Sequence, residues 1–288
     1  MLGKLLKHEM KALAHWFVPL YIGVGIAMVL FGIGWTINLA WDNEIFSTII
    51  TMSLLFLFMA TLAVISLGTF AIIIIQFYKT MVSDEGYLTH TLPVTVDQLL
   101  ISKGLAGFIW NVLAIIAMAL VILFAIFLTL VTTGAIDSNF WMEFVEMWNS
   151  LRAEIKEGIR LALGDITGSL ILLGVEFIVL LIISGFSKLY LVYLSMALGQ
   201  SVKGHKFLWS TIFYICILIG TGMISQIVTT VVMLGYGIST NDAVFESLNY
   251  FNFYTHGMML TSILLSAAYL FGSYFLSRYL LKNRLNLD

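Results

Sequence analysis

Six long runs of apolar residues set the strongest limit on what this chain can fold into. They lie at about 16–40, 47–78, 105–133, 167–198, 207–235 and 257–281. A helix needs about 20 apolar residues to cross the hydrocarbon core of a bilayer. The chain is 60% hydrophobic and 10% charged, whereas soluble domains carry about 25% charged residues. The sequence therefore predicts an all-α integral membrane protein with six transmembrane helices in a single transmembrane domain, residues 1–288.

The second and fourth runs are longer than a straight crossing requires, so we expect these helices to tilt or to project beyond the bilayer. Tryptophan rings favour the headgroup level of a membrane, and several tryptophans fall near the ends of the runs. They are Trp16, Trp35, Trp41, Trp110 and Trp209.

The first 15 residues predict a separate interfacial helix, because their apolar and polar side chains separate at helical spacing. The segment lacks the early apolar core of a secretory signal peptide, and Glu9 lies among its lysines. One face carries Leu2, Leu6, Met10, Leu13 and Phe17. Another face carries Lys4, His8, Lys11 and His15.

The distribution of lysine and arginine predicts the orientation. Of the 14 basic residues, 11 fall on the side of the N-terminus, the 79–104 loop, the 199–206 loop and the C-terminus. The other side holds Arg152, Lys156 and Arg160. The positive-inside rule then places both termini in the cytoplasm.

On the predicted outer side, residues from about 138 to 163 have an amphipathic pattern. Apolar residues such as Phe144, Trp148 and Leu151 step by three and four, and the acidic residues fall largely elsewhere. This pattern predicts an outer amphipathic helix that lies on the membrane surface or against a partner. It serves either as a structural lid or as a substrate gate.

A polar stretch, SDEGYLTHTLPVTVDQLLISK (83–103), separates the second and third runs. Asp84 and Glu85 suit the first turn of a short helix, and Pro93 ends that segment. Thr95 and Gln98 have the spacing of a capping box and should begin the third transmembrane helix. The stretch predicts either a short helix that docks a soluble partner or a purely structural turn.

The longer segment FYKTMVSDEGYLTHTLPVTVDQLLISK resembles the region between the second and third spans of type-2 ATP-binding-cassette (ABC) exporter permeases. The resemblance is closest to a subgroup from low-GC Gram-positive bacteria with the pattern D-E-G-Y-L…T-L-P-V…L-L-x-S-K. It implies a permease in a bacterial cell membrane that pairs with a second copy, as a homo- or heterodimer, and docks cytoplasmic ATPase subunits. The implied coupling helix and its frame are Asp84, Glu85, Gly86, Tyr87, Leu88, Thr89 and Pro93, with Lys79 and Lys103 at the edges. His90 departs from the family pattern.

The chain contains no G-x-x-x-x-G-K-[ST] phosphate-binding motif, so ATP and Mg would belong to a partner subunit. A second cytoplasmic loop, with Lys203, His205 and Lys206, is either a further contact with that partner or an ordinary basic loop. No H-E-x-x-H or G-x-S-x-G motif is present, so we expect no catalytic residue, no metal site and no enzyme activity in this chain.

Polar residues within the apolar runs are candidates for a translocation path. Glu176 is the clearest, because an ionisable residue in a span is costly and usually faces protein or water. It contacts substrate or a proton, or it is a structural acid bonded to Asn111, Ser225 or Gln226. His256, Asn111 and Gln226 are the lesser candidates, and polar residues of this kind often only join helices.

The resemblance implies an exporter permease that works by alternating access, with an antimicrobial peptide or a drug as its cargo, and the features above agree with it. An ion-coupled secondary transporter is one alternative, although Pro19 and Pro93 are the only prolines and neither interrupts a midplane. A non-transporting membrane scaffold or sensor is another.

Overall fold

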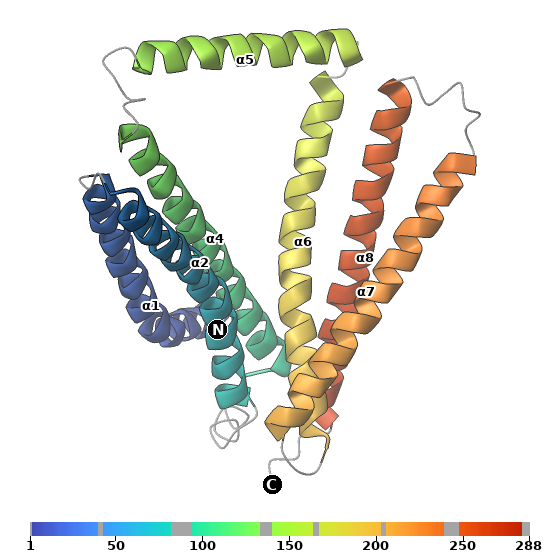
Figure 1. The fold of residues 1–288 in the computed structure, drawn as a ribbon. Helices are drawn as coiled ribbons and strands as arrows, with labels where there is room; N and C mark the ends of the chain where they lie inside the picture. Colours follow the sequence, from blue (N-terminus) through green and yellow to red (C-terminus); the bar gives the residue numbers. More distant parts are fainter. Residues whose placement is uncertain are drawn as a thin grey trace. The chain divides into compact units, whose positions relative to one another are not determined.

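The computed structural model of the protein describes residues 2–39, 43–81, 94–132, 140–163, 167–202, 206–238 and 248–283. These ranges fold almost entirely into helices (Figure 1). The helices are α1 Leu2–Leu39, α2 Glu44–Met81, α4 Val96–Thr132, α5 Phe140–Leu163, α6 Thr167–Gln200, α7 Lys206–Ile238 and α8 Leu248–Asn283. All of them except α5 contain a segment long and apolar enough to cross a membrane, which makes six such helices. The predicted all-α, multi-pass membrane fold is therefore confirmed.

The starts of α2 and α4 follow from side chains that satisfy the free backbone N–H groups of a first helical turn. At α4, the backbone N–H of Gln98 donates to the Thr95 hydroxyl at 3.3 Å, and the Thr95 N–H donates to the Gln98 amide oxygen at 3.4 Å. This reciprocal pair is the capping box that the sequence predicts. At α2, the Asn43 side-chain oxygen accepts the N–H groups of Ile45 and Phe46.

The predicted interfacial helix and the first span form one continuous helix, α1, rather than two elements. Pro19 lies inside it, and Figure 1 shows a bend in α1, as expected for a helix that contains a proline. The amphipathic assignment of its first turns holds, since Leu13 and Phe17 are buried whereas Lys11 is exposed.

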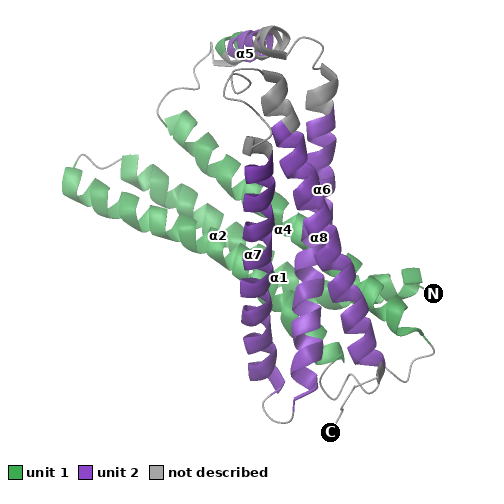
Figure 2. Ribbon diagram, turned by 90° about the vertical axis from the view of Figure 1, so that its right-hand side faces the viewer, with its two compact units in different colours: residues 1–81, 92–146 green, residues 82–91, 147–288 purple. Residues whose placement is uncertain are grey.

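The helices form two compact units, coloured separately in Figure 2. Unit 1 comprises residues 1–81 and 92–146 and contains α1, α2 and α4; unit 2 comprises residues 82–91 and 147–288 and contains α6, α7 and α8. Helix α5 contributes residues to each unit. It agrees with the predicted amphipathic helix in its bounds, and its apolar side chains Met142, Val145 and Trp148 are exposed.

Unit 1 packs α1, α2 and α4 around a small aliphatic core of Val24, Ile65, Ala114 and Val121. An aromatic stack adds to this core, because the Phe17 and Trp110 rings lie 4.3 Å apart and nearly parallel. Trp110 is only 8% exposed, so it joins α4 to α1 inside the unit.

Unit 2 packs α6 against both α7 and α8. The second half of α6 is the best buried, with Tyr193 at its centre, 1% exposed. The turn from α6 to α7 brings two backbones together: a Cβ atom on Gly199 would lie 2.8 Å from the Ser210 Cα. Helices α7 and α8 are further joined through the Tyr269 hydroxyl, which lies 3.0 Å from the Ser225 hydroxyl.

Candidate functional site

A buried ionic contact joins the three helices of unit 1. The Lys103 ammonium group on α4 donates to the Glu9 carboxylate on α1 at 2.5 Å and to the Thr80 hydroxyl on α2 at 2.8 Å. Lys103 is 4% exposed and Glu9 is 8% exposed. The Thr80 hydroxyl in turn donates to the Gln76 carbonyl at 2.7 Å. We call Glu9, Thr80 and Lys103 the three-helix node.

The node is stable only as a complete set. Removing an ammonium group or a carboxylate from water costs several kcal/mol for each ion, and their mutual attraction offsets this cost only with good geometry and further hydrogen bonds. The short contact to Glu9 and the second acceptor on Thr80 supply both conditions. The ion pair of Lys103 with Glu9 therefore holds α4 to α1.

The node lies on the two helices that flank the predicted docking residues. Thr80 is the next-to-last residue of α2, and Lys103 lies two turns after the start of α4 at Val96. Residues 82–93, which include Asp84, Glu85, Gly86, Tyr87, Leu88, Thr89, His90 and Pro93, lie outside the described residues. Their assignment as a coupling helix stays a prediction.

The two lysines expected to frame the docking residues differ in environment. Lys79 is exposed at the end of α2, whereas Lys103 is buried within unit 1. Lys103 therefore presents no charge to a membrane surface. Without it, 10 of the remaining 13 basic residues still fall on the predicted cytoplasmic side, so the orientation prediction does not depend on it.

Two of the translocation-path candidates meet in unit 2. The Nδ1 atom of His256 on α8 lies 2.8 Å from the Glu176 carboxylate on α6. Both side chains are partly accessible, at 21% for His256 and 16% for Glu176. The neighbour bonded to Glu176 is thus His256, which the sequence did not offer as its partner. Ser225, one of the partners that it did offer, lies against Tyr269 instead.

The other predicted site residues do not join this pair. Asn111 is half-buried on α4, and Gln226 is exposed on α7. Lys206 is the first residue of α7 and is half-buried, with its backbone carbonyl accepting from the Ser210 hydroxyl at 2.9 Å. Lys203 and His205 lie outside the described residues.

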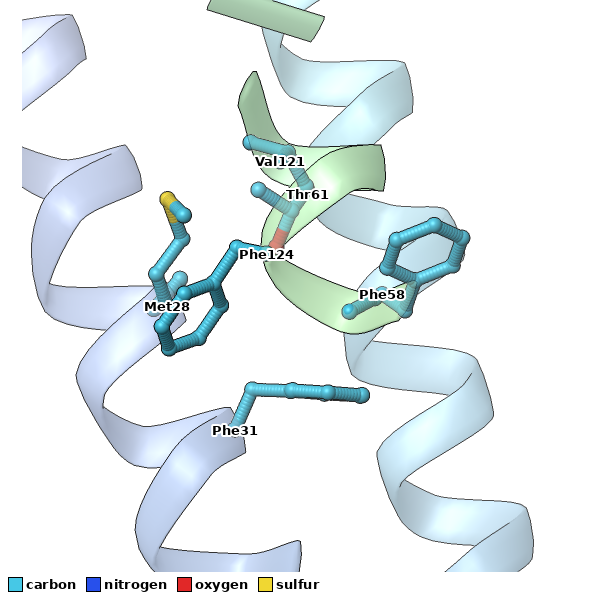
Figure 3. A pocket seen from close by; sticks show the side chains of 8 residues that line it. Met28, Phe31, Phe58, Thr61, Val121 and Phe124 are labelled. Atoms are coloured by element: carbon cyan, nitrogen blue, oxygen red, sulfur yellow. The ribbon is translucent and has the colours of Figure 1, made fainter. Parts of the chain in front are cut away.

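Unit 1 also contains a small pocket between its three helices (Figure 3). Met28 and Phe31 come from α1, Phe58 and Thr61 from α2, and Phe124 from α4, and the figure shows their side chains around the space. The cavity volume is about 10 Å³, far below the 300–1,000 Å³ typical of ligand pockets. The Thr61 hydroxyl already donates to the Leu57 carbonyl at 2.8 Å. We interpret this pocket as a packing gap.

Sequence reasoning missed the three-helix node, although one signal was present. Glu9 lies three residues after Leu6 and four before Leu13, so it shares the apolar face of the first turns of α1. An acidic residue on an apolar face requires a buried partner. No feature of the sequence identifies that partner as Lys103, which is 94 positions away.

Comparison of the chain with known protein families, with curated proteins and with solved structures returned no match. The features that bear on function are therefore the three-helix node, the Glu176–His256 pair and the chemistry of the sequence.

Proposed function

We propose that this chain is the permease subunit of an ATP-driven exporter whose ATPase subunits are separate polypeptides that dock on residues 82–93. The observation that supports this proposal best is the three-helix node. It ties together α2 and α4, the helices on either side of residues 82–93, and fastens both to α1. A docking element needs such rigid support to transmit force from a soluble partner.

The chemistry of residues 82–93 fits a docking role. Asp84 and Glu85 supply an acidic rim, and Tyr87 supplies the aromatic contact that protein interfaces favour at their centre. Such side chains are of little use inside a bilayer. The ABC permease resemblance assigns the same residues to the coupling helix, which enters a cleft in the ATPase.

The proposed cycle is alternating access by a dimer of permease subunits. ATP binding closes the two ATPases, and their movement displaces the coupling helices and the long spans around a central path. ATP can drive this change only if it binds one conformation of the complex better than the other. The Glu176–His256 pair is our candidate for a polar contact of the cargo along that path.

A co-purification experiment tests the proposal. The protein is extracted from its native membrane in mild detergent, with and without cross-linking, and the bound proteins are identified. We expect an ATPase with a phosphate-binding motif in a ratio of about one to one. The double variant Asp84→Lys and Glu85→Lys should release it, whereas Glu146→Lys with Glu154→Lys on α5 makes the same charge change and should not. Recovery of the chain alone, even after cross-linking, would overturn the proposal.

The Glu176–His256 pair favours one alternative, an ion-coupled secondary transporter. Ionisable side chains within spans often form proton or ion pathways. Flux in liposomes that contain only this chain decides between the two functions. Flux driven by an ion gradient without ATPase favours the secondary transporter, and flux that requires the ATPase and ATP favours the exporter.

A further inference from the structure

We propose that the three-helix node is the joint through which movement of residues 82–93 reaches α1, so that α1, α2 and α4 respond as one body. This inference rests on the proposed function, because it assigns positioning residues to the coupling step. It concerns Glu9, Thr80 and Lys103, which the sequence did not place in a functional site together.

The position of the node supports this role. Only Met81 separates Thr80 from residue 82, so a displacement of the segment acts almost directly on the Thr80 hydroxyl. Lys103 lies seven residues beyond Val96, about 10 Å along the helix axis. The two sides of the segment therefore converge on one ammonium group, and that group holds the Glu9 carboxylate of α1.

The helices around the node are packed tightly enough to transmit a displacement. Phe77 and Met81 near the end of α2 are 2% and 0% exposed, and Leu99 and Leu100 near the start of α4 are 2% and 0% exposed. Close-packed interiors have low compressibility and transmit strain. A displacement of the end of α2 or of the start of α4 is thus passed between the helices instead of being absorbed by loose side chains.

The chemistry of the node also suits a joint. A well-packed hydrophobic contact would stabilise the three helices at least as well as a buried ion pair, so stability alone does not account for the charges. The four-carbon stem of lysine is flexible, and its ammonium group has three donors that rotate. Lys103 can therefore keep its bonds to Glu9 and Thr80 through small adjustments of its side chain while the three helices move together.

The functional test uses the complete complex of the chain with its ATPase in liposomes. We compare Lys103→Met and Glu9→Gln with the unmodified chain, with the conservative variant Lys103→Arg and with the charge exchange Glu9→Lys with Lys103→Glu. The control is Trp35→Phe. It removes the hydrogen bond of 2.9 Å from the Trp35 indole N–H to the Thr132 hydroxyl, which also joins α1 to α4 but lies far from the node along both helices.

We expect Lys103→Met and Glu9→Gln to keep the ATPase bound and to keep ATP turnover. The amount transported per ATP should fall about tenfold, within the range of a coupling free energy between two sites. The charge exchange and Lys103→Arg should recover part of the loss, and Trp35→Phe should transport normally. Unchanged transport per ATP in both node variants would overturn the inference.

A second measurement does not require the ATPase and covers the case in which a node variant assembles poorly. Spin labels are placed at the exposed positions Lys7 on α1 and Ile101 on α4, after the single cysteine, Cys216, is changed to serine. The unmodified node should give a narrow distribution of distances between the labels, and Lys103→Met should broaden it. An equally narrow distribution in Lys103→Met would show that the node does not hold α1, and would overturn the inference.

The two proposals fail in different ways. If the unmodified chain binds no ATPase, the exporter function is wrong, whatever the spin labels report. If the ATPase binds and drives transport but the node variants transport normally per ATP, the exporter function stands and the joint is wrong.

Discussion

The two units join the helix ends next to their loops by different means. In unit 1, the ends of α2 and α4 next to residues 82–93 are joined by the hydrogen bond from the Lys103 ammonium group to the Thr80 hydroxyl, and Lys103 also pairs with Glu9 on α1. In unit 2, the turn between α6 and α7 is joined by a close approach of backbones, which Gly199 permits because it has no Cβ atom. The hydrogen bonds of the first contact are directional and come from a flexible lysine side chain. The second contact is fixed because the two backbones touch.

The Glu9–Lys103 contact of unit 1 and the Glu176–His256 contact of unit 2 also differ in burial. The side chains of Lys103 and Glu9 are 3% and 11% exposed, whereas those of His256 and Glu176 are 21% and 16% exposed. A buried charge depends wholly on its partner, but a partly exposed one is also solvated by water or headgroups. We therefore interpret the node as a structural connection and the Glu176–His256 pair as a contact open to exchange with a ligand.

The largest effect is expected for Lys103→Met, which removes the ionic contact of unit 1 from one side. The Glu9 carboxylate would remain buried without its ammonium partner, which typically costs about 3–5 kcal/mol. Thermal unfolding of the purified protein in detergent should show a large fall in melting temperature.

Two controls accompany Lys103→Met. Lys7→Met removes an exposed lysine of α1 and should leave the melting temperature unchanged. The double variant Glu9→Gln with Lys103→Met removes both charges and should recover part of the loss. A melting temperature for Lys103→Met equal to that of the unmodified protein would contradict the burial of the pair.

A smaller effect is expected for Gly199→Ala, which tests the close approach in unit 2. The added methyl group would lie 2.7 Å from the Ser210 backbone nitrogen, and the two helices would have to separate. Overpacking of this kind costs about 1–3 kcal/mol. Gly220→Ala on α7 is the matched control, because its methyl group would meet nothing within 4 Å. Equal melting temperatures for the two variants would show that α6 and α7 do not meet closely at this turn.

Features that depend on one helix at a time could be predicted from the sequence. The six spans follow from apolar runs of sufficient length, and the start of α4 follows from the spacing of Thr95 and Gln98. The bounds of α5 follow from its amphipathic period. Each of these signals is local, since residues within a few positions of one another determine it.

Features that depend on which helices meet could not be predicted. From its sequence position Lys103 is predicted to be a charged loop residue. In the structure it is buried against Glu9 of α1. The stacking of Trp110 on Phe17 also joins two helices that are distant in the sequence. Likewise, the neighbours of Glu176 at helical spacing on α6 offer it no partner. Its partner is His256, 80 positions away in the sequence. A helical period identifies an apolar face but not the helix that covers it.

A modest effect on stability is expected for Glu176→Gln, which keeps the shape of the side chain and replaces its carboxyl group with an amide. This change alters the hydrogen bond to His256, but partial exposure lets solvent compensate, so the cost should be about 0.5–1 kcal/mol. His256→Gln should cost a similar amount, and the double variant should cost less than the sum, because both single changes break the same contact. Strict additivity of the three melting measurements would show that the two side chains do not interact.

The smallest effect is expected for Ser277→Ala on α8. The Ser277 side chain is 0% exposed, and its hydroxyl has no hydrogen-bond partner in the described part of the chain. Removing a buried and unpaired polar atom also removes its desolvation cost, so we expect a change within about 0.5 kcal/mol or a slight gain in stability. Ser273→Ala is the matched control: this side chain is 2% exposed, but its hydroxyl donates to the Tyr269 carbonyl at 2.6 Å. If Ser277→Ala lowers the melting temperature more than Ser273→Ala does, the Ser277 hydroxyl has a partner outside the described residues. In that case a polar contact stabilises α8 where the described residues show only close packing.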